Sequence, residues 1–537
     1  MNVPKYVRAA VAFCCFAAVV LFFLDFTQTL PDALHRLADI QFVPLLVSGS
    51  LIFICVYLAV TLLFGRIYCS VICPLGVMQD IFSRLGKIRN KKRSAFKYRK
   101  ESSVLRNIFF ILFLIGLADF PVFVTLLDPY SNFGRIMTAV FLPVIVSANN
   151  FVTEITDSGF LRFHSLNTAL PAVVLAAAVF VFVAALSFFR GRRYCNIICP
   201  VGTLLGFLSR FSFFRIRIQS GCVSCGLCEK ACKGECIDSK AKTVDASRCV
   251  MCFNCLGVCK KNSIAFTTGI RVHPLPSAKT DVSVPAPTAV IPVQASALPL
   301  RRTFLQWFLV SLGLPAIFGS AKRAGAAANT ADAAAGLPTG VSKIGYKMSF
   351  PVLPPGASSF GRFRRHCTGC LLCVTKCPAN IIVPSGTELG LAGFMQPIIK
   401  FANGFCNYDC TICSRICPTH ALKGLKVDEK HATQIGRVVF LKENCVVPNQ
   451  ETNCGACAEH CPTGAVKMQP YGDPQKSLTI PVIDPDLCVG CGACEHICPV
   501  KPFRAIYVDG LKQHGQAKPA YDPNEKQKEE KLEDFGF

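Results

Sequence analysis

The chain has 537 residues, enough for several domains, and 57 lysines and arginines against 33 acidic residues give it a formal charge of +24. Such a charge is common in nucleic-acid binders, but 52% of the residues are hydrophobic and many stand in long apolar runs. These runs indicate a protein of the lipid bilayer, so no nucleic-acid partner is expected. The spacing of the 32 cysteines excludes a disulfide scaffold, because they recur in short rows of four.

Four apolar segments open the chain, and each is near the length needed to cross the hydrocarbon of a bilayer. They are Val7–Phe26, Phe42–Phe64, Asn107–Leu127 and Asn167–Phe189. The stretch from Arg66 to Arg106 carries eleven basic residues. Positively charged loops stay in the cytoplasm, so we expect this loop and the N-terminus there. Residues 1–212 are therefore predicted to form a four-helix transmembrane domain of the cell inner membrane.

A twelve-residue motif occurs twice, each time at the end of an apolar segment. GRIYCSVICPLG begins at Gly65 and GRRYCNIICPVG begins at Gly191, with eight identical positions. Each copy contains a CxxxCP motif, and the four cysteines are Cys69, Cys73, Cys195 and Cys199. Brought together at the membrane edge, these thiolates can ligate one further iron centre or remain two redox-active dithiols. Four is a natural ligand number for a metal, which favours the iron centre.

Residues 213–270 contain two rows of cysteines with the spacing of a two-cluster ferredoxin, in which the last cysteine of each row ligates the other cluster. The rows are Cys222, Cys225, Cys228 and Cys232, and Cys249, Cys252, Cys255 and Cys259. Zinc sites more often use two short pairs separated by a longer loop, so these rows predict 4Fe-4S clusters. Cys236 is a spare cysteine that can replace Cys232 as a ligand, and the spacing does not choose between them.

A change of composition then separates two parts of the chain. Residues 271–300 are expected to form a proline-rich linker. An Arg-Arg pair at Arg301 opens the apolar segment 301–320, which is expected to be a fifth transmembrane helix or a twin-arginine-like signal anchor. An Ala/Gly/Pro-rich linker is expected over residues 321–360. Under both alternatives the chain crosses the membrane at this point.

We therefore expect residues 213–300 in the cytoplasm and residues 321–537 in the periplasm. Residues 361–515 are predicted to form a four-cluster ferredoxin domain, and residues 516–537 a charged tail. The four rows are Cys367, Cys370, Cys373 and Cys377; Cys406, Cys410, Cys413 and Cys417; Cys445, Cys454, Cys457 and Cys461; and Cys488, Cys491, Cys494 and Cys498. Each row ends in Cys-Pro, and the proline turns the last thiolate toward a neighbouring cluster. Six rows predict six 4Fe-4S clusters.

Other cofactors leave no trace in the sequence. No Cys-x-x-Cys-His occurs and no glycine-rich dinucleotide motif follows a strand, so we see no haem or flavin motif. Asp128, Tyr130 and Arg135, in the stretch DPYSNFGR, are expected at the outer membrane edge and are candidates for a quinol site. No catalytic residue is identified. The cysteines outside rows and motifs are expected to pack as small apolar residues on helix faces: Cys14, Cys15 and Cys55.

The four apolar spans, the two YCxxICPxG motifs and the ferredoxin rows of residues 1–265 resemble NapH, a membrane subunit of the quinol dehydrogenase that serves periplasmic nitrate reductase. The same module recurs in the NosR and RdxA/CcoG families of membrane ferredoxins. The twin-arginine segment and four rows of residues 301–510 resemble NapG, the exported ferredoxin subunit. The chain is thus similar to a NapH-type and a NapG-type subunit fused end to end.

This resemblance implies a multidomain membrane protein, in which an α-helical bundle with CxxxCP repeats carries ferredoxin-like α+β polycluster domains. It implies a quinol dehydrogenase that passes electrons from membrane quinol through 4Fe-4S clusters to a periplasmic redox protein or reductase. The alternative is a reductase or maintenance factor for the assembly of a metalloenzyme, as in RdxA/CcoG and NosR relatives. The resemblance also implies that the first and fourth exported rows share two clusters, and that the two middle rows share the other two.

Overall fold

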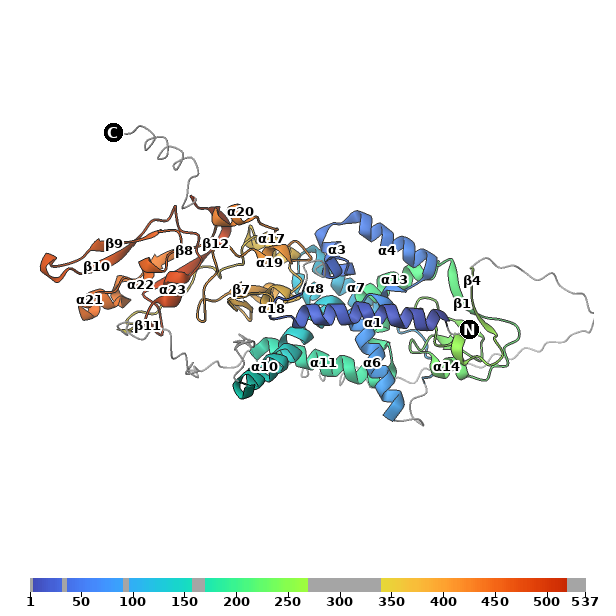
Figure 1. The fold of residues 1–537 in the computed structure, drawn as a ribbon. Helices are drawn as coiled ribbons and strands as arrows, with labels where there is room; N and C mark the ends of the chain where they lie inside the picture. The colour runs from blue at the N-terminus through green and yellow to red at the C-terminus, as the bar shows by residue number, and fades with distance from the viewer. Residues whose placement is uncertain (1–2, 31–35, 90–95, 157–169, 269–339, 519–537) are drawn as a thin grey trace, which may run out of the picture. The chain divides into compact units, whose positions relative to one another are not determined.

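Figure 1 shows a computed structural model of the chain. The structure describes residues 3–30, 36–89, 96–156, 170–268 and 340–518. Residues 1–270 and 337–537 belong to one compact unit. Several expected features lie outside the described residues: the linker at 271–300, the twin-arginine-like helix at 301–320, the first part of the next linker at 321–339, and the tail from residue 519.

Within the described residues, three helical segments are long and apolar enough to cross a membrane. Helix α1 (Val3–Leu24) and helix α11 (Leu170–Arg190) cover the first and fourth expected spans. The third segment, Pro129–Ile155, was not expected to be a span. It consists of α9 (Pro129–Ile136), the π-helical turn η2 (Met137–Phe141) and α10 (Leu142–Thr156).

The second and third expected spans are wrong as single helices, because each is broken into two. The second consists of α3 (Phe42–Ser48) and α4 (Leu51–Phe64), and Gly49 between them takes a left-handed φ of 77°. Glycine adopts this conformation without a steric penalty and commonly ends helices. The third consists of α7 (Ser103–Ala118) and α8 (Pro121–Leu127), which starts on its proline. Proline fits the first turn of a new helix, where its missing N–H would have no partner.

Both CxxxCP motifs fold in the same way, as a short helix followed by a longer helix that starts at the proline. In the first copy α5 (Tyr68–Val71) precedes α6 (Pro74–Arg89). In the second copy α12 (Arg193–Ile197) precedes α13 (Pro200–Ser209). The repeat in sequence is therefore also a repeat in structure, with the second cysteine of each pair placed directly before a helix.

Residues 214–268 form a small domain with two cysteine rows, which we call the middle ferredoxin domain. Its antiparallel strand pairs are β1 (Phe214–Ile218) with β4 (Ile264–Thr268), and β2 (Ile237–Asp238) with β3 (Thr243–Val244). Its short helical turns are α14 (Leu227–Ala231) and η3 (Leu256–Val258). Two short helical turns that accompany two cysteine rows are the arrangement expected for two neighbouring clusters.

Residues 340–518 form the C-terminal ferredoxin domain. Its antiparallel strand pairs are β6 (Ile382–Pro384) with β7 (Pro397–Ile399), β9 (Val466–Pro470) with β10 (Thr479–Ile483), and β8 (Thr433–Phe440) with β12 (Ile506–Gln516), and its parallel pair is β5 (Gly340–Val341) with β11 (Val500–Lys501). Its helices are α17 (Phe360–His366), α18 (Leu372–Thr375), α19 (Ile412–Arg415), α20 (Val427–His431), α21 (Val446–Gln450), α22 (Ala456–Glu459) and α23 (Ala493–Ile497). Two separate hydrophobic cores divide the domain into a first half and a second half.

The start of this domain was placed too late by the sequence. Val352, Leu353 and Ala357, which fell in the expected linker at 321–360, are almost completely buried in the core of the first half. The Val352 carbonyl accepts a hydrogen bond of 2.8 Å from the backbone N–H of Ile399 in β7. Prolines and glycine dilute the apolar residues here, so composition alone indicated a linker where a core segment lies.

The helices of residues 3–211 include the three segments long and apolar enough to cross a bilayer, and we call them the membrane helices. One hydrophobic core connects them with both ferredoxin domains. It contains cysteines of both CxxxCP motifs, Val250 of the middle ferredoxin domain, and Leu372 and Ile416 of the C-terminal ferredoxin domain. Burial of these apolar side chains against one another ties the three cysteine-bearing regions together.

Candidate metal centres

The first two rows of the C-terminal ferredoxin domain form two sites, each completed by the last cysteine of the other row. The thiols of the first row interact electrostatically with the Cys417 thiol. We call this set the proximal site: Cys367, Cys370, Cys373 and Cys417. A cavity beside it is lined by the four cysteines that we call the second site: Cys377, Cys406, Cys410 and Cys413.

The last two rows are arranged in the same way. Cys461 interacts with the fourth row to give the third site: Cys461, Cys488, Cys491 and Cys494. Cys498 interacts with the third row to give the distal site: Cys445, Cys454, Cys457 and Cys498. Four thiols gathered from two rows are the donor set of a 4Fe-4S cluster, so these residues fit that group.

This pairing corrects the one implied by the family resemblance, in which the first row shares clusters with the fourth. Cys417 joins the first row, not the third, and Cys498 joins the third row, not the first. The physical reason is that each pair of consecutive rows has its own hydrophobic core, so the last cysteine of a row reaches only its neighbour. The domain therefore consists of two successive two-cluster units.

The middle ferredoxin domain brings five thiols around one space. A cavity there is lined by Cys232, Cys236, Cys249, Cys252 and Cys255. The Sγ atoms of Cys232 and Cys236 lie 3.4 Å apart, and the hydrogen bond from Cys236 lowers the pKa of Cys232 to about 7. Cys232 is therefore the better thiolate of the two, with Cys236 as its hydrogen-bond donor. In the first row, Cys228 interacts with the thiols of Cys222 and Cys225.

The two CxxxCP motifs meet, and their four cysteines form a buried group that we call the quartet: Cys69, Cys73, Cys195 and Cys199. The Cys199 thiol interacts with the other three, and the Cys73 thiol interacts with Cys69 and Cys195. Burial raises the pKa of Cys73 and Cys199 well above the usual range. Because thiolate is the reactive form of cysteine, these buried thiols suit a metal, which stabilises thiolate, better than free dithiol chemistry.

Each repeat holds the cysteine loop of the other through an arginine. The Arg66 guanidinium donates to the Cys195 carbonyl at 3.1 Å, and the Arg192 guanidinium donates to the Cys69 carbonyl. Glycines make this close approach possible, because a Cβ on Gly76 or on its counterpart in the second motif would overlap the cysteine carbonyl oxygen. The reciprocal contacts fix the two motifs against each other.

The buried carboxylate of Asp80, which the sequence did not point to, balances part of the positive charge of the buried arginines and lysine around the quartet. Asp80 lies 2.8 Å from Arg192, 3.2 Å from Lys233 and 3.5 Å from Arg8. Burial opposes its ionisation, but Arg192 and Lys233 hold the pKa of Asp80 well below its usual range. Lys233 directly follows Cys232, so this carboxylate connects the quartet with the middle ferredoxin domain. An acidic residue in α6 gave no sequence signal, because its partners come from three distant segments.

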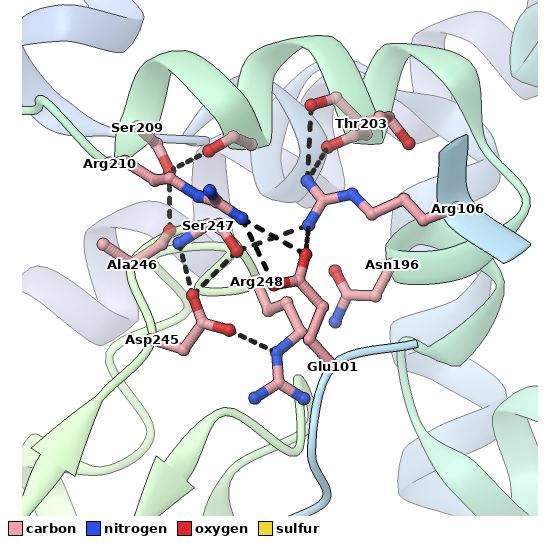
Figure 2. A network of polar contacts seen from close by, with 12 residues as sticks. Glu101, Arg106, Asn196, Thr203, Ser209, Arg210, Asp245, Ala246, Ser247 and Arg248 are labelled. Carbon is pink, nitrogen blue, oxygen red and sulfur yellow. Dashed lines mark hydrogen bonds and ion pairs between the residues drawn. The ribbon is translucent and has the colours of Figure 1, made fainter. Parts of the chain in front are cut away.

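A second polar network fastens the middle ferredoxin domain to the membrane helices (Figure 2). Arg106 at the start of α7 pairs with Glu101 at 2.5 Å and donates to the Ser247 hydroxyl at 3.3 Å. Arg66 donates to the Ser247 carbonyl at 2.9 Å. Ser247 stands two residues before Cys249 of the second row. The loop that begins the second row is thus held by arginines on either side of the basic segment.

The three quinol candidates lie in the protein interior. Asp128, Tyr130 and Arg135 are each at most 1% exposed. Asp128 caps α9 by accepting from the backbone N–H groups of Tyr130 and Ser131 at 3.1 and 3.0 Å. Arg135 donates to the Thr125 carbonyl at 2.5 Å. The Tyr130 hydroxyl is buried and has no hydrogen-bond partner among the described residues. A quinol role for these three residues stays a prediction.

The C-terminal ferredoxin domain contacts the membrane helices through its first row. Thr375 hydrogen bonds with Thr138 of η2 at 3.0 Å, and Lys376 pairs with Asp25 at 2.5 Å. A Cβ on Gly134 would overlap the Cys370 carbonyl oxygen, so helix α9 touches the backbone of the row itself. The proximal site is therefore adjacent to the membrane helices.

Comparisons with known proteins identify 4Fe-4S domains in two parts of the chain. The family model of a 4Fe-4S binding domain matches residues 47–93 and 172–219, which contain the two CxxxCP motifs. The model of a 4Fe-4S dicluster domain matches residues 452–501, which contain most of the last two rows. No solved structure matches the chain.

Several curated proteins are similar to parts of the chain. The ferredoxin-type protein NapF of Escherichia coli is 28% identical over 162 residues, which are 30% of this chain and 88% of NapF. The methylamine utilization ferredoxin-type protein MauM of Methylobacillus flagellatus is 32% identical over 154 residues, 27% of this chain and 62% of MauM. YccM of Escherichia coli, named as a candidate electron transport protein, is 25% identical over 215 residues, 40% of this chain and 54% of YccM. The two 4Fe-4S models and these ferredoxin-type relatives support an iron–sulfur electron-transfer protein.

Proposed function

We propose that this chain is a membrane-bound quinol dehydrogenase component that passes electrons from membrane quinol, through six 4Fe-4S clusters, to a periplasmic redox protein. The observation that carries the proposal is the continuous core that joins Val250 of the middle ferredoxin domain with Leu372 of the C-terminal ferredoxin domain. Electron tunnelling weakens steeply with distance, so a route across a membrane needs closely packed centres. Cysteines of the quartet belong to the same core.

Helix α1 supports a topology with the two ferredoxin domains on opposite sides of the membrane. Arg8 contacts the Asp80 network next to the middle ferredoxin domain, whereas Asp25 contacts Lys376 of the C-terminal ferredoxin domain. These two positions are 17 residues apart, which is about 26 Å along a helix. This separation approaches the roughly 30 Å of a bilayer hydrocarbon core. The basic loop packs on the middle ferredoxin domain, so we assign that domain to the cytoplasm and the other to the periplasm.

We assign a further iron centre to the quartet. Among the described residues, no group of three or more Cys, His, Asp or Glu side chains is arranged to hold a single metal ion. A 4Fe-4S cluster is held by four cysteine thiolates, and four buried cysteines are the donor set that the quartet offers. Such a centre supplies one-electron redox chemistry. The chain's own part is to hold it away from water and to balance its charge with Arg66 and Arg192.

The test starts from the anaerobically purified chain in lipid nanodiscs. Iron and sulfide analysis should give about six 4Fe-4S equivalents, or slightly more with iron in the quartet. Added quinol should reduce the clusters of both ferredoxin domains. The double variant Cys69→Ala, Cys195→Ala should keep the six clusters but lose quinol-driven reduction of the C-terminal ferredoxin domain.

The matched control is Cys55→Ala, because Cys55 lies exposed on α4 away from the quartet. In this variant, quinol should reduce the clusters of the C-terminal ferredoxin domain at the same rate as in the unchanged protein. Stoichiometric zinc with little iron would end the proposal of six clusters. Full quinol-driven reduction in the double variant would remove the quartet from the route.

A further inference from the structure

One face of the helix formed by α9 and η2 rests on the first row of the C-terminal ferredoxin domain. Gly134 touches the Cys370 carbonyl, and Thr138 bonds to Thr375 at 3.0 Å. Between them, Arg135 donates to the Gly369 carbonyl at 3.4 Å. The helix passes into a π-helical turn at this point, a feature often found at functional sites.

The same arginine is connected to the quartet through two polar side chains. Arg135 donates to the Asn132 side-chain oxygen at 2.8 Å, and the Asn132 amide lies 3.4 Å from the Tyr194 hydroxyl. Tyr194 is buried and directly precedes Cys195. A short buried bridge of three side chains therefore spans the distance between the quartet and the loop of the proximal site.

The Arg135 guanidinium interacts with the buried Asp128 carboxylate and also with the proximal-site thiols of Cys370 and Cys367. Its hydrogen bonds all go to neutral acceptors: the carbonyls of Thr125 and Gly369 and the amide oxygen of Asn132. The Asp128 carboxylate is shared, because it also caps α9 by accepting from the backbone N–H groups of Tyr130 and Ser131. A buried cation beside a cluster favours the reduced state, which carries one more negative charge.

Resting on the proposed function, we propose that electrons pass between the quartet and the C-terminal ferredoxin domain through the cluster of the proximal site. Arg135 is then a positioning residue that raises the reduction potential of the proximal cluster. With clusters bound by the quartet and by the proximal-site cysteines, the chemistry supplied would be the transfer of one electron from the first to the second. No bond forms or breaks, and no proton is required. The electron originates from quinol oxidation and leaves to the periplasmic oxidant.

Contacts between the sites then define an order. The Cys373 thiol of the proximal site interacts with Cys413 of the second site. Cys406 of the second site donates its backbone N–H to the Cys491 carbonyl of the third site at 2.9 Å. Cys494 of the third site interacts with Cys457 of the distal site. These contacts give the order proximal, second, third, distal.

The first experiment is a redox titration followed by electron paramagnetic resonance on the full chain in nanodiscs, with dithionite and mediators. Arg135→Gln should lower the midpoint potential of one cluster by at least a tenfold change in its reduction equilibrium, about 59 mV for one electron. The signal that moves should be the one absent in Cys417→Ser. Arg135→Lys should keep most of the unchanged potential because it keeps the charge. Lys518→Gln, the same charge loss at an exposed position of this domain, should move nothing.

A second variant keeps the test decisive if Arg135→Gln fails to fold. Asn132→Leu keeps the charge but releases the anchor of Arg135, and should move the same signal in the same direction by a smaller amount. Unchanged potentials in both variants, or a shift of the signal lost in Cys498→Ser instead, would overturn the assignment. A shift in Lys518→Gln of equal size would overturn the role of the buried charge.

The second experiment separates the order of stations from the proposed function. With quinol as reductant, Cys417→Ser should leave the second, third and distal clusters oxidised, with at least a tenfold loss in the rate of their reduction. Wild-type reduction rates at those clusters would overturn the order while the proposed function stands. If quinol fails to reduce the unchanged protein, the proposed function falls, and the potential shift of Arg135→Gln still decides the role of that residue.

Discussion

The buried ion pair between Asp25 and Lys376 makes a sharp prediction about how the C-terminal ferredoxin domain stays on the membrane helices. The carboxylate and ammonium are 2.5 Å apart, with side chains only 4% and 5% exposed. Lys376 also donates to the Asp25 carbonyl at 3.0 Å and stands over the Phe22 ring, 4.9 Å from its centre. We predict that Asp25→Asn and Lys376→Met weaken this contact unequally.

The free-energy cost of each single variant depends on the partners that remain for the unpaired charge. Removing one member of a buried ion pair costs about 3–5 kcal/mol when the other charge is left without compensation. Asp25→Asn leaves the Lys376 ammonium with neutral oxygens and an aromatic ring but no carboxylate, so we expect a loss near that range. Lys376→Met leaves a carboxylate that still accepts from the backbone N–H groups of Thr29 and Leu30 at 3.0 and 3.3 Å. Its cost should be smaller, about 1–3 kcal/mol.

The double variant removes both charges, so its cost should be clearly less than the sum of the single costs. Hydrogen exchange of the amides in residues 367–377, measured on the full chain in nanodiscs, reports the free energy of opening this contact. Lys400→Met is the matched control, because its ion pair with Glu388 is half exposed and should be worth less than about 1 kcal/mol. If the two single effects add to within about 0.5 kcal/mol, the pair contributes no coupling and the reasoning is refuted.

Three further predictions follow from local contacts. Gly134→Ala should increase hydrogen exchange around Cys370, because the new methyl group overlaps its carbonyl, whereas Gly361→Ala, with open space, should not. Cys236→Ala should lower the potential of the neighbouring cluster by removing a hydrogen bond to sulfur, while leaving its iron content intact; loss of that iron would make Cys236 a ligand. Burial lowers the pKa of His514 to about 4. As the pH falls from 6.5 to 5, the unfolded state takes up the proton first, so the C-terminal ferredoxin domain should lose up to about 2 kcal/mol of stability. Thermal unfolding of His514→Gln should not show this pH dependence.

The sequence predicted the chemistry of the sites better than their connections. Spacing within a row is a local property, so the row from Cys367 to Cys377 indicated a cluster without any structure. Which row supplies the fourth ligand depends on tertiary packing, and the resemblance to a family predicted it wrongly for Cys417 and Cys498. The likeness of the two CxxxCP motifs likewise predicted a shared site, but not the arginines that exchange partners between them.

The helices show the same limit. Apolar length correctly placed α1 and α11, whose sequences contain no internal helix-ending signal. It failed for the span containing Gly49, because a single left-handed residue splits an apolar run that hydropathy treats as continuous. It also missed Pro129–Ile155, where Asn132 and Arg135 reduce the apolar character of the first turns. Both polar residues are satisfied by partners from other segments, which only the folded structure supplies.

The two repeats are equal in form and unequal in charge, and this difference bears on the quartet. Asp80 of the first repeat neutralises Arg192, but the corresponding position of the second repeat is Gly206, where the absence of a side chain makes room for the Arg106 guanidinium. Arg66 is left with hydrogen bonds to the neutral oxygens of Asn196, Ser247 and Cys195, and its guanidinium lies 3.9 Å from the Cys69 sulfur. A buried cation without a carboxylate partner is costly unless an anion faces it. A thiolate-ligated centre in the quartet is such an anion, so the asymmetry that evolved between two near-identical motifs is the one expected if they hold a negatively charged cluster together.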